Sequence, residues 1–337
     1  MLAYISYPEW LDPRVIPGLP IRWYGVMYLL AFIITFFLFR YEIRRRDPSV
    51  QTEEILDLFF WTIVGLLIGG RVFATLVYGD SGYYLRQPWL MFWPFDENMN
   101  FTGLQGMSYH GGLLGGVVAA LLFTRHKRID FVAWADVVAA AAPLGYTLGR
   151  LGNFINGELY GRVTTAPWGM VFPSARPVDA GREWVRRVAA EVGMDIEAGT
   201  QLVNLPRHPS QLYEAFFEGI VLWAVLWLVL RKRKLFRGAL LGIYVIGYAF
   251  FRLVLEYFRQ PDPGMDFVVR LSSKPNPPEL FVSVLNLTMG QVLSLIMLAA
   301  GAVFLWLMYR RHRRRPMVHT LETDRSDSSR ARPDQTE

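Results

Sequence analysis

Long apolar segments separated by polar connections run along most of this chain, from Trp23 to Met308. Several of them approach the ~20 residues that a helix needs to cross a bilayer. The third is short, so it must borrow residues from Met107–His110 or be partly buried in protein. The pattern predicts an all-α, polytopic membrane protein with seven transmembrane helices. The seven segments are Trp23–Phe39, Leu58–Val77, Gly111–Phe123, Phe131–Leu148, Leu212–Leu230, Leu240–Phe258 and Met289–Met308.

Basic residues cluster after alternate segments, and this sets the expected orientation. The opposite connections are poor in Lys and Arg for their length, and residues 78–109 contain only Arg86. Cytoplasmic loops of membrane proteins carry the excess of Lys and Arg. We therefore expect the N-terminus outside and the C-terminus in the cytoplasm. The clusters are Arg40 with Arg44–Arg46; Arg125, Lys127 and Arg128; Arg231–Lys234 with Arg237; and Arg310, Arg311 and Arg313–Arg315.

The polar parts of the chain suggest a simple domain organisation. Residues 1–315 form one integral membrane domain, and residues 316–337 form a cytoplasmic tail, rich in Ser, Asp and Arg, that we expect to be disordered. Residues 162–209, inserted between the fourth and fifth spans, are predicted to form a small extracytoplasmic cap. Within the cap, Asp179–Gly193 has the pattern of a short amphipathic helix that stops at Gly193.

Composition narrows the functional classes. With 53% hydrophobic and 19% charged residues, the 337-residue chain is too apolar for an ordinary soluble domain. The net charge of +6 follows from membrane topology, so we expect no nucleic-acid partner. The absence of cysteine excludes disulfides, zinc–thiolate sites and a cysteine nucleophile. We see no metal-binding cluster in the sequence, and we predict neither a metal nor a cofactor.

The densest polar cluster beside an apolar segment is Gly149–Gly161, which holds an arginine, two asparagines, a glutamate and four glycines. Ionisable groups at membrane depth usually face a cavity or a partner, and glycines let the backbone approach a ligand. With the orientation above, other embedded polar groups also fall in the outer leaflet, the main exception being Asp136. We therefore predict one polar cavity for an anionic head group under the extracytoplasmic face. These groups are Tyr24, Arg71, His110, Glu214, Glu218, Arg252 and Glu256.

Several of these residues also have a purely structural interpretation, which the sequence leaves open. Arg252 and Glu256, four residues apart, suit an ion pair inside the bundle. Arg71 is placed to extend to the outer head groups, and Glu214 and Glu218 suit the first turns of a helix. The glycines that suit close helix packing are Gly65, Gly69, Gly70, Gly111, Gly112, Gly115 and Gly116.

Several motifs then point to one family. The stretch Gly149-Arg-Leu-Gly-Asn-Phe-Ile-Asn-Gly-Glu resembles the signature of bacterial prolipoprotein diacylglyceryl transferases. The resemblance covers all seven predicted spans, and it is weak or absent in residues 162–205, 262–287 and beyond 316. Other motifs that agree in order are Trp23-Tyr24-Gly25, Met107-Ser108-Tyr109-His110-Gly111-Gly112, Arg207–Glu214 and Phe251–Pro261.

The resemblance implies a transferase of the bacterial inner membrane whose active site faces the extracytoplasmic side. Such an enzyme moves the diacylglyceryl group from phosphatidylglycerol to the thiol of a lipobox cysteine in a preprolipoprotein. The products are a thioether-linked precursor and glycerol phosphate, in the first step of lipoprotein maturation. The positions that the resemblance implicates are Tyr24, His110, Arg150, Asn153, Glu158, Gly161, Arg252 and Glu256.

The side chains suit this chemistry. A thiol with a pKa of ~8.5 is mostly protonated at neutral pH, so the reaction needs a base, for which His110 is the candidate. The forked guanidinium groups of Arg150 and Arg252 suit the departing phosphate. An open alternative is that His110 only positions the lipid, and that a carboxylate or a water is the base. Further candidates for substrate binding are Arg71 and the backbone N–H groups of Gly111 and Gly112.

Tyr24 is expected to hydrogen-bond the lipid head group, while Glu158 or Glu256 orients an arginine or holds the glycerol hydroxyls. Two other classes of protein are alternatives for a chain with these residues. A serine acyltransferase or protease would use Ser108 with His110, but the chain has no Gly-x-Ser-x-Gly elbow. An anion or lipid transporter lined by the arginines would more often show repeated halves and a midplane site, which the sequence does not suggest.

Overall fold

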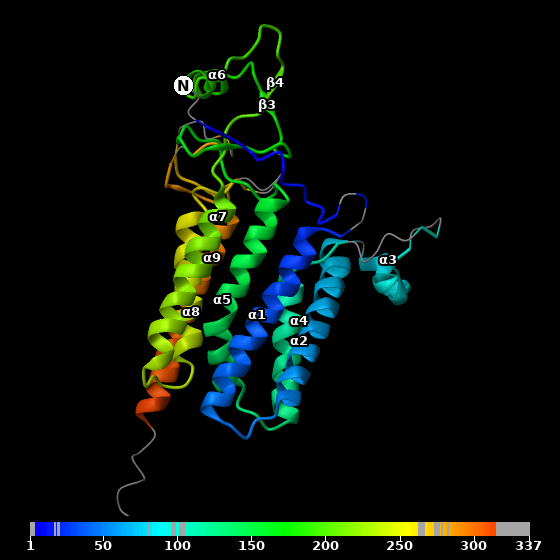
Figure 1. Ribbon diagram of the computed structural model, residues 1–337, viewed down its shortest axis with the longest axis vertical. Coiled ribbons are helices and arrows are strands. Elements are labelled where there is room, and N and C mark those ends of the chain that lie inside the picture. The colour runs from blue at the N-terminus through cyan, green and yellow to red at the C-terminus, as the bar shows by residue number, and fades with distance from the viewer. Residues whose placement is uncertain are drawn as a thin grey trace, which may run out of the picture.

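The computed structural model describes residues 4–16, 18, 21–79, 81–95, 99–100, 106–261, 267–272, 277, 279–281 and 283–314. The predicted disordered tail, 316–337, lies outside these residues. Figure 1 shows long helices side by side along the long axis, with a smaller region around α6 (Glu183–Glu191) at one end. The protein is therefore mostly helical, as expected.

Six of the seven predicted apolar segments lie in a helix or in a run of consecutive helices, and these helices extend past the apolar residues into polar ones. The remaining segment, Leu240–Phe258, continues three residues past the end of its helix at Leu255. Five of these runs are long and apolar enough to cross a membrane. The other two, α4 (Tyr109–His126) and α8 (Ala239–Leu255), contain 18 and 17 residues. The elements are α1 (Trp23–Arg46), α2 (Thr52–Phe73) with η1 (Ala74–Tyr78), α4 (Tyr109–His126), α5 (Phe131–Ile155), α7 (Ser210–Glu214) with η3 (Ala215–Val221), η4 (Ala224–Val229) and η5 (Leu230–Lys232), α8 (Ala239–Leu255) and α9 (Met289–Arg313).

Side-chain caps fix where three of these helices begin. The Ser108 hydroxyl accepts the N–H of Gly111 at 3.2 Å at the start of α4. Asp130 plays the same role at the start of α5. Thr288 and Gln291 form a reciprocal capping box at the start of α9. Such caps satisfy N–H groups that have no partner within the helix.

Glycines bring α2 and α4 into close contact. A Cβ atom on Gly65 or Gly69 would overlap the backbone of Gly115 or Gly111 on the facing helix. This confirms that these glycines form a close-packing surface, which is common between membrane helices. Elsewhere α1 packs on α5, and α8 packs on α9. Helix α5 also contacts η3 and α8, so it lies at the centre of the bundle.

The end of the bundle far from α6 is held by two buried acids. The Asp136 carboxylate accepts the backbone N–H groups of Gly238 at 2.7 Å and Leu241 at 2.8 Å, so it caps α8 from a neighbouring helix. Glu42 of α1 forms a buried ion pair with Arg231. Asp136, which the sequence placed outside the predicted cavity, thus has a structural role.

The predicted cap contains the amphipathic helix that the sequence indicated. The helix, α6, begins at Glu183 rather than at Asp179, because Val178–Asp179 forms strand β3 against β4 (Leu202–Val203). Gly193 follows the helix with a φ of 70°, which suits its role as the stop. The N-terminal segment joins this region, since β1 (Ile5–Ser6) pairs with β2 (Met170–Val171). The remaining elements are α3 (Ser81–Arg86), η2 (Pro88–Phe92), β5 (Val269–Arg270) and β6 (Asn286–Leu287).

Candidate active site

Arg150 lies in the last turns of the central helix α5, and its side chain is largely buried. Its Nε atom lies 2.7 Å from the Tyr146 hydroxyl and 2.9 Å from Oε2 of Glu214. Its Nη1 atom donates to the Asn153 side-chain oxygen at 3.3 Å. Tyr146 in turn donates to Glu218. Side chains from α5, α7 and η3 therefore hold the guanidinium of Arg150 in one orientation.

Arg252, near the end of α8, faces the same carboxylate. Its Nη1 atom lies 3.4 Å from Oε1 of Glu214, and its Nη2 atom lies 2.7 Å from Oε2 of Glu256. Glu256 also accepts the hydroxyl of Thr288 at 3.0 Å, which ties the end of α8 to the start of α9. The structural interpretation of the Arg252–Glu256 pair is therefore confirmed. Arg252 nevertheless belongs to the same network as Arg150.

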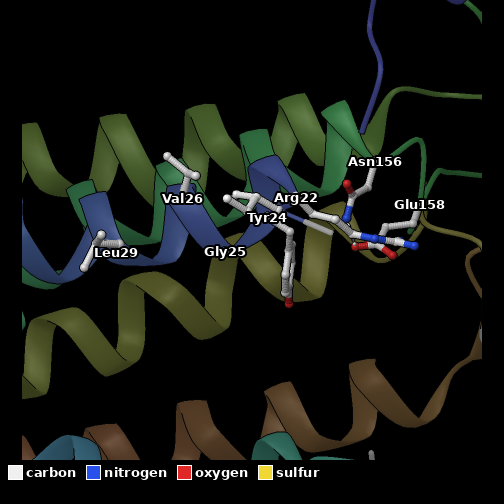
Figure 2. Close-up of a pocket in the computed structure, with 8 residues that line it drawn as sticks. Arg22, Tyr24, Gly25, Val26, Leu29, Asn156 and Glu158 are labelled. Atoms are coloured by element: carbon white, nitrogen blue, oxygen red, sulfur yellow. Dashed lines mark hydrogen bonds between the residues drawn. The ribbon is translucent and has the colours of Figure 1, made fainter. Parts of the chain in front are cut away.

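Asn153 extends this network toward a pocket at the end of α1. The Asn153 amide donates to Glu158 at 2.9 Å, and Glu158 lines the pocket of about 670 Å³. In Figure 2, Arg22 and Glu158 lie at one end of this pocket, while apolar side chains such as Leu29 lie further along α1. Tyr24 also lines the pocket, and its hydroxyl lies 2.9 Å from that of Tyr28. The pocket thus has a polar end and an apolar length, as a phospholipid has.

The other predicted site residues lie elsewhere. His110 is exposed in the first turn of α4, where its ring contacts that of Tyr109. Among the described residues, no hydrogen bond or ion pair joins His110 to Arg150 or Arg252. The N–H groups of Gly111 and Gly112 donate to Ser108 at 3.2 and 2.9 Å, so both already have partners.

Ser108 and Arg71 have structural partners. Ser108 is buried as the cap of α4, and no hydrogen bond joins it to His110 in the described part of the chain. The proposed serine nucleophile therefore has no histidine partner here. Arg71 is buried, so it does not extend to the head groups. It donates to the backbone oxygens of Met91 and, at 3.2 Å, Gly106, which ties α2 to the segment before α4.

Gly161 lies where the cap region meets the bundle. Its N–H donates to the His208 oxygen at 2.8 Å, and a Cβ atom there would lie 2.7 Å from the His208 Cβ and overlap the oxygen of Phe258. The structure therefore requires a glycine for packing; a role in substrate binding stays a prediction. Burial lowers the pKa of His208 to about 4, so this histidine is neutral at physiological pH.

The network also contains Glu214 and Glu218, which were predicted to lie in the polar cavity but were given no role in catalysis or substrate binding, and Tyr146, which was not predicted. Glu214 and Glu218 are fully buried, whereas first-turn acids that only complement a helix dipole are usually exposed. The signal for both was their spacing of four residues within an apolar segment. Tyr146 precedes Arg150 by the same spacing on α5.

The arrangement suits the binding of a phosphate or another oxyanion. Two guanidinium groups from different helices face one carboxylate, and guanidinium groups bind phosphate through paired N–H donors. No group of three or more potential metal-ligating side chains occurs in the described ranges. Arg150 and Arg252 can supply charge stabilisation and hydrogen bonding to such an anion.

Comparison with known proteins gives a consistent result. The profile of the family described as "Prolipoprotein diacylglyceryl transferase" matches residues 14–307. A relative from Treponema denticola is 47% identical over 325 residues, which cover 92% of this chain and 96% of the relative. One from Treponema pallidum is 48% identical, over 92% and 97%. One from Chlorobaculum tepidum is 41% identical, over 89% and 91%. All three are named phosphatidylglycerol–prolipoprotein diacylglyceryl transferase.

Proposed function

The chain belongs to the prolipoprotein diacylglyceryl transferase family, and we propose that it catalyses diacylglyceryl transfer from phosphatidylglycerol to a prolipoprotein. The acceptor is the thiol of a lipobox cysteine. The sulfur attacks the glycerol carbon that carries the phosphate, a carbon–sulfur bond forms, and the carbon–oxygen bond to the phosphate breaks. Glycerol phosphate leaves with the electron pair of that bond.

We propose that seven helices cross the bacterial inner membrane, with the N-terminus outside and the C-terminus in the cytoplasm. The clusters of Lys and Arg after alternate helices support this orientation. Residues 162–209 then form an extracytoplasmic cap, and the Arg150–Arg252 network opens on the same side. A prolipoprotein translocated across the membrane presents its lipobox at that face.

In this proposal, Arg150 and Arg252 bind the phosphate of the lipid and stabilise its growing negative charge as the bond breaks. The observation that carries the proposal is that the two arginines, more than 100 positions apart in sequence, lie within 2.9 and 3.4 Å of the same buried carboxylate, Glu214. Guanidinium groups are costly to bury at membrane depth, so their convergence supports a functional anion site.

Other residues are proposed to bind the acyl chains and glycerol of the lipid and to accept the proton of the thiol. The apolar side chains of the pocket along α1 suit an acyl chain, and Glu158 and Tyr24 suit the polar glycerol end. His110 is exposed, and its imidazole is able to take the thiol proton once the peptide binds. His110 lies outside the hydrogen-bonded network, so its role as the base depends on how the peptide is seated.

The test is a transfer assay with purified protein, phosphatidylglycerol and a peptide that contains a lipobox cysteine. We expect the peptide mass to increase by one diacylglyceryl group. Arg150→Gln or Arg252→Gln should lower kcat by about 10²-fold or more, as loss of a donor to developing charge does. Arg231→Gln, at the other end of the bundle, is the control and should retain turnover. No mass gain in the wild-type protein, as a transporter would give, or normal turnover in both arginine variants, would contradict the proposal.

A further inference from the structure

Glu214 occupies the centre of an arginine cluster. Three guanidinium groups approach its carboxylate: Arg150 at 2.9 Å, Arg252 at 3.4 Å and Arg259 at 3.8 Å. These arginines come from α5, from α8 and from the residues after α8. The Glu214 side chain therefore forms ion pairs with several parts of the bundle. Glu214 is only 1% exposed, so water does not solvate its charge.

The carboxylate acts on these arginines mainly through its charge. Among the described residues, neither oxygen of Glu214 has a hydrogen-bond partner of good geometry, and Nη1 of Arg252 is likewise buried without one. The N–H groups of Arg150 that have acceptors point instead at Tyr146 and Asn153. Glu214 therefore neutralises the arginines without using the N–H bonds that an anionic ligand needs.

An arginine pair at this depth needs such a counter-charge. Buried cations without a partner are strongly unfavourable, and two of them repel each other. Without a carboxylate between them, Arg150 and Arg252 would separate or bind any available anion tightly. With it, both stay in place while the net positive charge that a phosphate meets is reduced.

We propose that Glu214 is a positioning residue for transfer: it holds Arg150 and Arg252 at a fixed spacing and weakens their hold on the released glycerol phosphate. This proposal rests on the phosphate-binding role given to the two arginines above. Glu214 does not touch the reacting atoms. It makes the site bind the phosphate strongly enough for reaction and weakly enough for product release.

The test measures product inhibition in the transfer assay. Glycerol phosphate and inorganic phosphate are each added as inhibitors, and their inhibition constants are compared between variants. Glu214→Gln keeps the volume but removes the charge, so it should bind both anions at least about tenfold more tightly while kcat falls. Glu214→Asp keeps the charge on a shorter side chain, so the inhibition constants should stay near wild type while kcat falls.

Glu42→Gln is a matched control, because Glu42 is also fully buried and also meets three arginines. They are Arg46 at 2.8 Å, Arg45 at 3.8 Å and Arg231, all at the opposite end of the bundle. This variant should be less stable to heat yet show unchanged inhibition constants. A purely structural role of Glu214 would give the same result for Glu214→Gln.

Two outcomes overturn the proposal, and they differ from failure of the proposed function. Unchanged or weaker phosphate inhibition in Glu214→Gln contradicts the counter-charge role. Tighter phosphate inhibition in Glu214→Asp also contradicts it. The Glu214→Asp variant decides the matter if the Glu214→Gln variant does not fold. By contrast, a wild-type protein that neither anion inhibits, with full turnover in Arg150→Gln, would contradict phosphate binding by the arginines themselves.

Discussion

A methyl group at Gly161 should separate the cap region from the bundle. The Cβ of alanine would lie 2.7 Å from both the Cβ and the oxygen of His208 and would overlap the backbone oxygen of Phe258. None of these atoms is the far end of a flexible side chain. The segments must therefore move apart, which strains two backbone hydrogen bonds of 2.8 Å, from Gly161 to His208 and from Arg162 to Phe258.

The expected cost follows from these contacts. Overpacking of this kind costs about 1–3 kcal/mol, and weakening two hydrogen bonds adds about 1 kcal/mol for each. We therefore expect Gly161→Ala to lower the free energy of unfolding by about 3–5 kcal/mol. The measurement is denaturant unfolding in detergent, followed by the fluorescence of the 11 tryptophans.

Gly149→Ala is the matched control. Gly149 belongs to the same sequence signature, but a methyl group there would meet no atom of a neighbouring segment within 4 Å in the described part of the chain. Gly149 lies inside α5, where alanine is favoured over glycine by about 1 kcal/mol. This variant should be as stable as the wild type or slightly more so. Equal unfolding midpoints for Gly161→Ala and the wild type would refute the packing argument.

Three further predictions concern other parts of the molecule. Asp136→Asn should cost about 2 kcal/mol of stability, because an amide has only one acceptor oxygen for two N–H groups, while the exposed Asp130→Asn should cost less. Gly115→Ala, but not Gly116→Ala, should push α2 from α4 and lower the melting temperature. Because burial lowers the pKa of His208 to about 4, stability should fall as the pH drops from ~6.5 toward 4, where only the unfolded chain gains the proton. Melting temperatures of wild type and His208→Gln across this range would test it, and equal slopes would contradict it.

Apolar periodicity predicted the helices well, because each membrane-sized apolar run must satisfy its own backbone hydrogen bonds as a helix. It did not predict their ends. Helix α1 continues to Arg46, and α9 to Arg313, because polar residues extend a helix beyond the apolar run at no loss of hydrogen bonds. Two short helices, α3 and η2, follow α2 and η1 along the chain. No apolar periodicity in the sequence marks them.

The candidate site was predicted in part. Depth along the helices correctly brought Arg150, Asn153 and Glu158 together, and Arg252 with Glu256. Depth does not reveal direction around a helix axis, so it did not separate His110 from this network. Nor did it identify Glu214 as the carboxylate between the arginines, since that depends on how α5, α7 and α8 face one another.

The roles of Arg71 and Gly111 depend on partners that the sequence does not identify. Arg71 is held by the backbone oxygens of Met91 and Gly106, and no sequence pattern marks a backbone oxygen as a partner. The sequence is compatible with a ligand-binding or a packing role for Gly111, and the structure shows the packing. A glycine suits either role, and only the facing helix distinguishes ligand binding from packing.

The central claim is that Arg150 and Arg252 together hold the phosphate of the lipid. A structure of the protein with bound phosphatidylglycerol tests it most directly. We predict phosphate oxygens about 2.7–2.9 Å from guanidinium nitrogens of both arginines, with Glu214 still between them and an acyl chain along α1. A lipid phosphate bound elsewhere, with both arginines engaged only by protein carboxylates, would contradict the claim.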